Sequence, residues 1–305
     1  MYESFYGLSG KPFSLLPDGE MLYLSKKHRM AVNLLEYGMM SQAGFIVISG
    51  EVGAGKTTVI RRYLKNAGPD TTVGLITNSN KAFGRLLTWV AMAFGIDHRG
   101  RDYVKLYNRF LAFLLEQYGA GKRTVLIMDE AQNFKPDVLE ELRMLSNVNN
   151  EKDQLLQIVL VGQPELLDTL RRPDLRQFVQ RISVHCHIEP LELADVANYI
   201  RFRLTTMGGQ ADIFDDQACV AVHYLTGGVP RLINLLCDVA LVYGFSEELR
   251  QIAWPIVVEA VKDRNRNGLS PFKDVPPDLV AFEAEVLRPL SATLTEIPPG
   301  NRKGC

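Results

Sequence analysis

Short apolar runs alternate with amphipathic stretches from residue 45 onward. The runs are FIVISG, TVGLIT, TVLIMDE and QIVLVGQ, and the stretches between them repeat apolar residues at helical spacing. Two of the runs contain VLIM and IVLV, which are apolar at every position, as expected of strands buried on both faces. This alternation predicts a parallel sheet covered by helices, with those two runs as central strands.

The same pattern divides the chain into four parts. Residues 1–44 combine an irregular segment, anchored by its aromatic side chains, with a following helix. Residues 45–189 form the α/β core, and 190–264 predict a small helical domain that is interrupted by two glycine pairs. Residues 265–305 are rich in proline and predict a tail with one short helix over 278–288.

Composition narrows the functional classes. Lys and Arg total 34 against 35 Asp and Glu, so the net charge of −1 gives no global reason to expect nucleic acid or an anionic membrane as a partner. No signal peptide or transmembrane run is present, and the four cysteines are too far apart for a zinc site or a disulfide framework. We therefore expect a cytoplasmic protein without a transmembrane segment.

A phosphate-binding loop follows the first predicted strand. The spacing is G-x-x-x-x-G-K-[ST], and a helical pattern follows it, as such a loop requires. Its members are Gly50, Glu51, Val52, Gly53, Ala54, Gly55, Lys56 and Thr57. Backbone N–H groups and Lys56 would bind phosphate oxygens, and the Thr57 hydroxyl would ligate Mg²⁺. The loop predicts ATP and Mg²⁺ as ligands, against the alternative of an ordinary glycine-rich turn.

Polar residues end two of the predicted central strands. Asp129 and Glu130 follow VLIM, at the sheet edge where ligands of parallel sheets bind. Asp129 would hold Mg²⁺ through water, and Glu130 would polarise the attacking water. Gln163 ends the next strand and would reach the γ-phosphate or that water, unless it merely bonds the following turn.

Arginines supply candidates for completing the site. Arg181 directly precedes the last strand and is the first candidate for a finger acting in a neighbouring subunit, with Arg176 second. The remaining arginines of that run fit a solvated helix face. Arg231 opens a helix after the GGVP turn, where a cation opposes the helix dipole, so we expect it to bind phosphate rather than form a surface ion pair.

Two segments that contain histidine, 185–187 and 26–29, could either pack and face solvent in the ordinary way or bind a ligand. His185 and His187 flank Cys186, but strand alternation sends Cys186 to the opposite face, which favours packing over a metal cluster. The basic cluster at 26–29 opens a helix and fits a solvated helix start, with DNA or a partner as the alternative.

The order of motifs then becomes specific. The motifs are YGLSGKPFSLLPD, LYLSKKHRMAVNLLEYG, GFIVISGEVGAGKTT, LIMDEAQNF, LRMLSNV, IVLVGQPELLDTL, LRQFVQRI and GGVPRLINLLCD. Together they resemble the general secretion pathway protein A (ExeA-type) ATPases over about residues 1–262. Related families include ATPases of pilus biogenesis and of exosortase and exopolysaccharide systems.

The resemblance implies a AAA+ module in which a P-loop sheet sandwiched by helices is followed by a helical lid. It implies Walker A at Gly50–Thr58, which adds Thr58 to the loop, and Walker B at Asp129 and Glu130. It implies sensor 1 at Gln163, a finger at Arg181 and sensor 2 at Arg231. Adenine would lie near the N-terminal segment.

Secretion members usually continue into a membrane span and a peptidoglycan-binding domain. This sequence contains neither, so we expect no cell-wall binding. The leading expectation is an oligomeric ATPase switch assisting a protein partner in secretion, pilus or exopolysaccharide export. Such a partner would allow a peripheral position at the inner membrane. The alternatives are a DNA-associated regulator resembling transposition ATPases and a nucleotide-binding scaffold of low turnover.

Overall fold

The computed structural model divides the chain into two compact units. The described residues are 1–15, 21–77, 85–99, 102–149, 154–268 and 270–295. One unit is Lys26–Glu189, and the other joins Met1–Ser25 to the chain from Pro190 onward. The sequence prediction keeps residues 1–44 together, whereas the structure divides them at Ser25, directly before the first helix.

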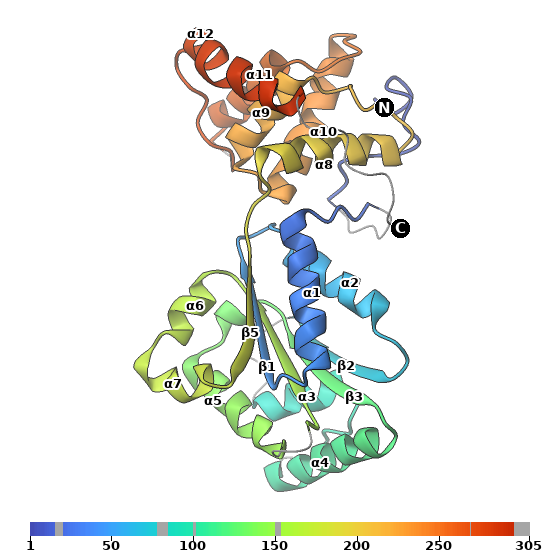
Figure 1. Ribbon diagram of the computed structural model, residues 1–305, viewed down its shortest axis with the longest axis vertical. Coiled ribbons are helices and arrows are strands. Elements are labelled where there is room, and N and C mark those ends of the chain that lie inside the picture. Colours follow the sequence, from blue (N-terminus) through green and yellow to red (C-terminus); the bar gives the residue numbers. More distant parts are fainter. Residues whose placement is uncertain (16–20, 78–84, 100–101, 150–153, 269, 296–305) are drawn as a thin grey trace. The chain divides into compact units, whose positions relative to one another are not determined.

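The core unit is a parallel α/β sheet (Figure 1). In chain order its strands and helices are α1 (Lys26–Met40), β1 (Phe45–Gly50), α2 (Lys56–Asn66), β2 (Thr71–Ile76), α3 (Leu86–Ala93), α4 (Tyr103–Gly119), β3 (Arg123–Met128), α5 (Pro136–Leu145), β4 (Gln157–Gly162), α6 (Glu165–Leu170), α7 (Arg176–Val179) and β5 (Ile182–Ile188). The strand order is β2-β3-β4-β1-β5, and every pairing is parallel. The predicted fold class is confirmed, and the runs predicted as central strands, β3 and β4, are internal.

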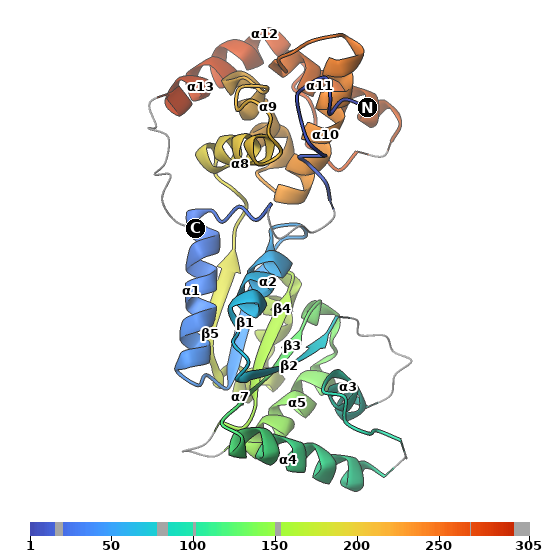
Figure 2. The same cartoon turned by 90° about the vertical axis from the view of Figure 1, so that its right-hand side faces the viewer.

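Alternate residues of each central strand pack on opposite faces of this sheet. In β1, Phe45 and Val47 join the apolar cluster formed with α3 to α7. Ile46 and Ile48 join the cluster formed with α1 and α2. Figure 2 shows α1 and α2 close to β1 and β5. Because helices cover both faces, these strands have to be apolar throughout, which is the pattern that the sequence shows.

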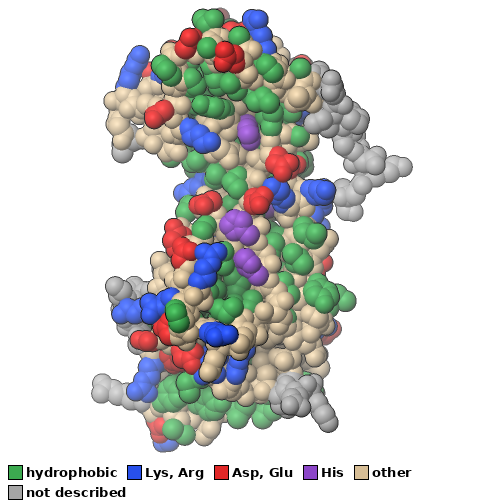
Figure 3. Space-filling model, turned by 60° about the vertical axis from the view of Figure 1, so that its left-hand side comes forward, with side chains coloured by type: hydrophobic (Ala, Val, Ile, Leu, Met, Phe, Trp, Pro, Cys, Tyr) green, Lys and Arg blue, Asp and Glu red, His purple; other side chains and the backbone are tan. Residues whose placement is uncertain are grey.

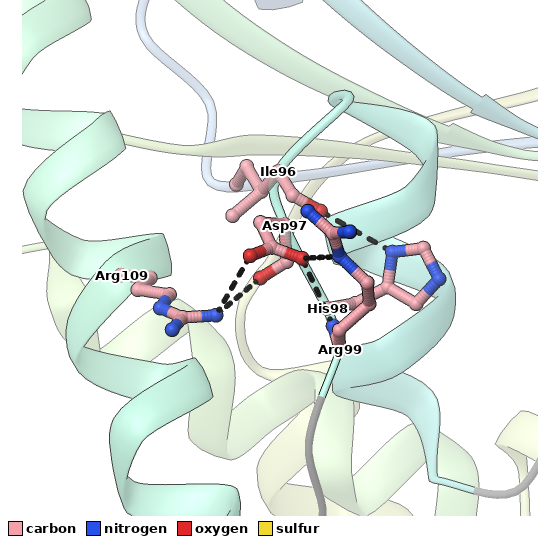
Figure 4. A network of polar contacts seen from close by, with 5 residues as sticks. All are labelled: Ile96, Asp97, His98, Arg99 and Arg109. Atoms are coloured by element: carbon pink, nitrogen blue, oxygen red, sulfur yellow. Dashed lines mark hydrogen bonds and ion pairs between the residues drawn. The ribbon is translucent and has the colours of Figure 1, made fainter.

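A polar network orders the connection between α3 and α4 (Figure 4). The Asp97 carboxylate accepts hydrogen bonds from the backbone N–H of Arg99 at 3.1 Å and from its Nε at 2.9 Å. Arg109 of α4 donates to the Asp97 carbonyl oxygen at 2.9 Å. The Arg99 guanidinium lowers the pKa of the Asp97 carboxyl group. Since these groups are exposed, water screens their charges, and the network shapes the loop more than it stabilises the unit.

The second unit is helical. It contains α8 (Leu193–Thr206), α9 (Asp216–Thr226), α10 (Pro230–Ser246), α11 (Trp254–Arg266), α12 (Leu279–Phe282) and α13 (Arg288–Thr295). One contiguous apolar cluster fills it, with α9 against α8, α10 and α11. No helix in the described part of the chain has both the length and the apolar composition needed to span a bilayer.

Polar contacts attach the N-terminal segment to this helical unit. Arg203 of α8 is 6% exposed and donates to the carbonyl oxygens of Ser14 at 3.0 Å and Met21 at 3.3 Å. Tyr6 and Phe13 are buried in the apolar cluster, as predicted from their aromatic character. A guanidinium with several rigid donors suits such a segment, because irregular backbone leaves carbonyl groups without partners of their own.

The C-terminal segment differs from the predicted tail. Phe282, Leu287 and Leu294 are at most 5% exposed and belong to the same cluster as the other helices. Pro271, Pro276 and Pro277 lie in the connection before α12, and Pro289 is the second residue of α13, so these prolines do not prevent packing. Residues 270–295 are therefore part of the helical unit, whereas 296–305 of the predicted tail lie outside the described residues.

Candidate functional site

The loop between β1 and α2 has the backbone of an anion cradle. Gly53 and Gly55 have φ angles of +79° and +102°, which only glycine adopts without strain. Ala54 is fully buried, and its N–H donates to the Glu51 carbonyl oxygen at 3.1 Å. Gly55 directly precedes α2, whose N-terminus adds positive potential.

Lys56 keeps its ammonium group inside this loop. The residue is 8% exposed, and Nζ donates to the carbonyl oxygens of Gly50 at 2.7 Å and Glu51 at 2.9 Å. Burial lowers the pKa of Lys56, and the charges of Glu130 and Asp129 oppose that shift. Of the two threonines after the lysine, Thr57 is exposed and Thr58 is half-buried.

Two carboxylates lie where β3 ends. The Asp129 N–H donates to the Ile76 carbonyl oxygen of β2 at 2.8 Å, which holds Asp129 at the carboxyl edge of the sheet. Its carboxylate accepts from the Glu130 N–H at 2.9 Å. Burial raises the pKa of Asp129, and the neighbouring charge of Glu130 adds to that shift. Glu130 has a left-handed backbone with φ of 55°, a conformation that costs about 1–3 kcal/mol and is often found at functional sites.

Two glutamines connect Glu130 to the end of β4. Gln132 Nε2 donates to Glu130 Oε2 at 2.6 Å, and Gln132 Oε1 accepts from the Gln163 backbone N–H at 3.0 Å. Gln163 Nε2 donates to the same Glu130 oxygen at 3.3 Å. The structure thus places Gln163 beside Glu130, and it adds Gln132 of the DEAQNF motif, which had no role in the sequence prediction.

Ser49, the residue before the loop, is held by two histidines of β5. Its hydroxyl lies 3.0 Å from His185 Nε2 and 2.9 Å from His187 Nδ1. The two histidines therefore share one face of the strand, as alternation predicts, while Cys186 packs in the apolar cluster on α1 and α2. Both rings are exposed, and Figure 3 shows histidines at the surface beside charged side chains. Within the described residues, no group of three potential ligands forms a metal site.

The arginine run separates into three kinds of residue. Arg171 and Arg172 form exposed ion pairs with nearby aspartates, as expected of a solvated face. Arg181 is half-buried and donates within its own chain to the Arg143 carbonyl oxygen at 3.1 Å and to Ser146 Oγ at 2.7 Å. It also precedes β5, so it lies at the amino edge of the parallel sheet, opposite the loop. These contacts hold the Arg181 side chain against its own chain, whereas Arg176 is exposed; a finger role stays a prediction for both.

Arg231 lies in the first turn of α10, in the helical unit. It is exposed, and it forms no ion pair with any residue that the structure describes. The turn before it is tightly packed: a Cβ on Gly228, which has φ of +76°, would lie 2.0 Å from the Leu191 carbonyl oxygen. Among the described residues, Arg231 does not form the surface ion pair that was the alternative, and the binding of Arg231 to phosphate stays a prediction.

The basic cluster at 26–29 differs from the solvated helix start that was predicted. Lys27 forms an ion pair with Glu189, and His28 is only 3% exposed. His28 Nε2 lies 2.9 Å from the Ala54 carbonyl oxygen. Periodicity alone could not reveal this contact, because the two residues belong to different elements. A histidine on the buried side of a helix was the available signal.

The charged and polar groups of this site fit a nucleoside triphosphate with Mg²⁺. The loop supplies backbone N–H groups and a buried ammonium, and the carboxylates of Asp129 and Glu130 act electrostatically on that ammonium. Hydroxyl and carboxylate oxygens are the ligands that Mg²⁺ prefers, and Thr57 and Asp129 provide them. Cationic and anionic groups that meet at one sheet edge match a bound phosphate chain together with its metal.

Known proteins resemble this chain in sequence. Residues 39–170 match a family model described as an AAA domain. Over 253 residues, or 83% of this chain, the sequence is 42% identical to general secretion pathway protein A of Aeromonas hydrophila. The chain spans 46% of that relative's length.

Solved structures give the same fold. The ORC2 protein of Aeropyrum pernix superposes with a TM-score of 0.60 at 15% identity, covering 87% of this chain and 72% of that one. CDC6P of Pyrobaculum aerophilum gives 0.60 at 17% identity, covering 82% and 72%. At such identities the likeness concerns the fold alone.

Proposed function

Since this chain belongs to the AAA family of P-loop ATPases that includes general secretion pathway protein A, we propose that it binds ATP with Mg²⁺ and hydrolyses it. One observation carries the proposal. The buried Lys56 ammonium, the Asp129 carboxylate and Glu130 with its two glutamines meet where β1, β3 and β4 end.

The residues of the loop bind and orient the phosphate chain in this proposal. Backbone N–H groups from Gly50 to Thr58 and the Lys56 ammonium bind its oxygens. Lys56 has three donors and uses two on its own loop, so it is already directed into the cradle. Thr57 and Asp129 hold Mg²⁺, which when bound neutralises charge on the phosphate oxygens.

Glu130 orients and polarises the attacking water. Its Oε2 is occupied by Gln132 and Gln163, whereas its Oε1 has no hydrogen bond to the residues that the structure describes. A carboxylate fixed through one oxygen presents the other in a defined direction, which is what a water-positioning group requires. Gln163 then senses the γ-phosphate through the same cluster.

Two arginines complete the proposal. We assign Arg231 to the bound phosphate chain, because it is exposed at a helix start without an ion pair to any described residue. For the finger supplied by a neighbouring subunit of a homo-oligomer, we prefer the exposed Arg176 to Arg181, whose Nη1 group already donates within its own chain. Mixing Arg176→Ala with Lys56→Ala protein should restore part of the activity if subunits share sites.

A role in envelope export rests on the sequence relative. We propose that hydrolysis assists a protein partner in a secretion, pilus or exopolysaccharide export system, because 42% identity joins this chain to a protein named for the general secretion pathway. Such a partner would keep the protein at the inner membrane. An ORC1 protein solved in complex with DNA shares the fold at only 17% identity, so DNA binding is a result to be tested rather than a second proposal.

The direct test compares three variants by phosphate release and by ATP titration. Glu130→Gln should keep ATP binding and lose roughly 10²–10⁴-fold in rate, because it removes the group that polarises water. Lys56→Ala should lose binding. Glu116→Gln, an exposed glutamate on α4, is the matched control and should behave as wild type.

Three results would contradict the proposal. A wild type that does not bind ATP excludes the function altogether. A negligible wild-type rate that Glu130→Gln leaves unchanged indicates a scaffold of low turnover. Strong stimulation by duplex DNA with a steep salt dependence would replace the export role with a DNA-associated one.

A further inference from the structure

His28 touches the phosphate loop from the side of α1. It is the third residue of that helix, is 3% exposed, and places Nε2 at 2.9 Å from the Ala54 carbonyl oxygen. A carbonyl oxygen only accepts hydrogen bonds, so Nε2 carries the proton and donates. A side chain distant in sequence thus holds the backbone of the loop.

This bond fixes the direction of one peptide group. The peptide bonds of the described chain are trans. The Ala54 C=O and the Gly55 N–H belong to the same planar peptide unit, so they point in opposite directions. Because His28 holds the carbonyl towards α1, the Gly55 N–H is turned away from α1. That N–H donates to no acceptor among the described residues.

We propose that His28 is a positioning residue that aims the Gly55 N–H at a phosphate oxygen of the bound nucleotide. The inference rests on the proposed binding of ATP and extends the site by one residue of α1. Without His28, no other described group donates to the Ala54 carbonyl oxygen, which could then turn into the cradle and repel phosphate.

The close approach between ring and loop supports the inference. A Cβ on Gly55 would lie 2.5 Å from His28 Nε2 and 3.2 Å from Cδ2, so the imidazole edge packs directly on the glycine backbone. The other loop carbonyls nearby have a different partner, since those of Gly50 and Glu51 accept from Lys56. His28 therefore holds the one carbonyl of this group that the lysine does not.

A packed core histidine would explain the burial of His28 equally well, and a pair of amide variants separates the two roles. His28→Gln places an amide nitrogen near the position of Nε2, whereas His28→Asn is one methylene too short to reach Ala54. Both are neutral and polar, so a role in packing alone predicts similar effects. His28→Leu is a third variant, which removes the hydrogen bond but keeps an apolar side chain. Heat unfolding of all three variants shows whether the proteins compared are folded.

The expected result is a difference in ATP affinity. Loss of an aimed hydrogen bond to a charged group corresponds to roughly a tenfold or greater weakening, which we expect for His28→Asn and for His28→Leu. His28→Gln should stay within about threefold of wild type by the same reasoning. Equal affinities in folded Gln and Asn variants, whether both normal or both weak, overturn the inference while leaving the proposed function intact.

A measurement without any substitution at His28 gives a second test. With ¹⁵N-labelled glycine, the Gly55 amide signal of the wild type, assigned through Gly55→Ala, should be among those that ATP shifts most. An unmoved Gly55 signal in protein that binds ATP contradicts the inference. Failure of the wild type to bind ATP is a different result, which removes the proposed function itself.

Discussion

The clearest prediction about the fold concerns Leu287, in the segment that the sequence marks as a tail. Leu287 is fully buried, whereas Leu290, three residues later in α13, is 39% exposed. Replacing a buried leucine with alanine removes its apolar contacts and leaves a cavity, at a cost of about 2–5 kcal/mol. Leu290→Ala removes the same atoms from a partly solvated site and should cost about 1 kcal/mol or less.

The two tryptophans allow this effect to be measured in the helical unit alone. Trp254 of α11 makes an edge contact with Phe282, with ring centroids 6.5 Å apart, whereas Trp89 lies in the core unit. In a Trp89→Phe background, Trp254 fluorescence therefore follows unfolding of the helical unit in urea. With a denaturant slope of about 2 kcal/mol per molar, a loss of about 3 kcal/mol lowers the midpoint by about 1–2 M.

Equal effects of the two substitutions would contradict the packing of this segment. If Leu287→Ala and Leu290→Ala shift the midpoint by the same small amount, residues 270–295 do not contribute to the core of the helical unit. A change in slope rather than midpoint would indicate that the substitution alters the denatured state or the cooperativity of unfolding. Agreement would establish this segment as part of the folded unit.

Three further predictions follow from the site and its surroundings. Burial raises the pKa of Asp129, so its ionised form destabilises the folded protein. Asp129→Asn should therefore raise the heat-unfolding midpoint at pH 8, and this rise should shrink at acid pH, where the wild-type carboxyl group is protonated. A rise of the same size at both pH values would exclude the buried charge as its cause. Arg181→Ala should lower the free energy of unfolding by about 1–3 kcal/mol, because it removes hydrogen bonds to Arg143 and Ser146. Arg176→Ala, at an exposed position, should lower it by less than about 0.5 kcal/mol. Equal values for the two variants in urea titrations would contradict a structural role of Arg181. Gly228→Ala should destabilise the helical unit by at least about 2 kcal/mol, since its Cβ would collide with the Leu191 carbonyl oxygen; an unchanged Trp254 transition would contradict that packing.

The sheet and the position of the candidate site along it can be predicted from the amino-acid pattern alone. Runs apolar at every position predict strands covered on both faces, and parallel strands bring the residues that follow them to one edge. The Gly50–Thr57 loop, Asp129 and Gln163 are therefore expected to lie together at that edge. The spacing of the loop also predicts its ligand, because few other residue patterns cradle phosphate.

The distant residues that support that site are visible only in the folded protein. Gln132 and His28 carry no periodic signal of function, yet one connects Glu130 to Gln163 and the other holds the Ala54 carbonyl. Their roles depend on the path of the chain through space, which local patterns do not encode.

The division of the chain into a core unit and a helical unit also depends on contacts between residues far apart in the sequence. The segment 1–25 joins the helices from Pro190 onward because Arg203 and a shared apolar cluster hold it there, and 270–295 packs although its prolines resemble those of a tail. A hydrophobic pattern shows that a face will be buried, but the partner that buries it is selected by shape and by the apolar area that the whole fold removes from water.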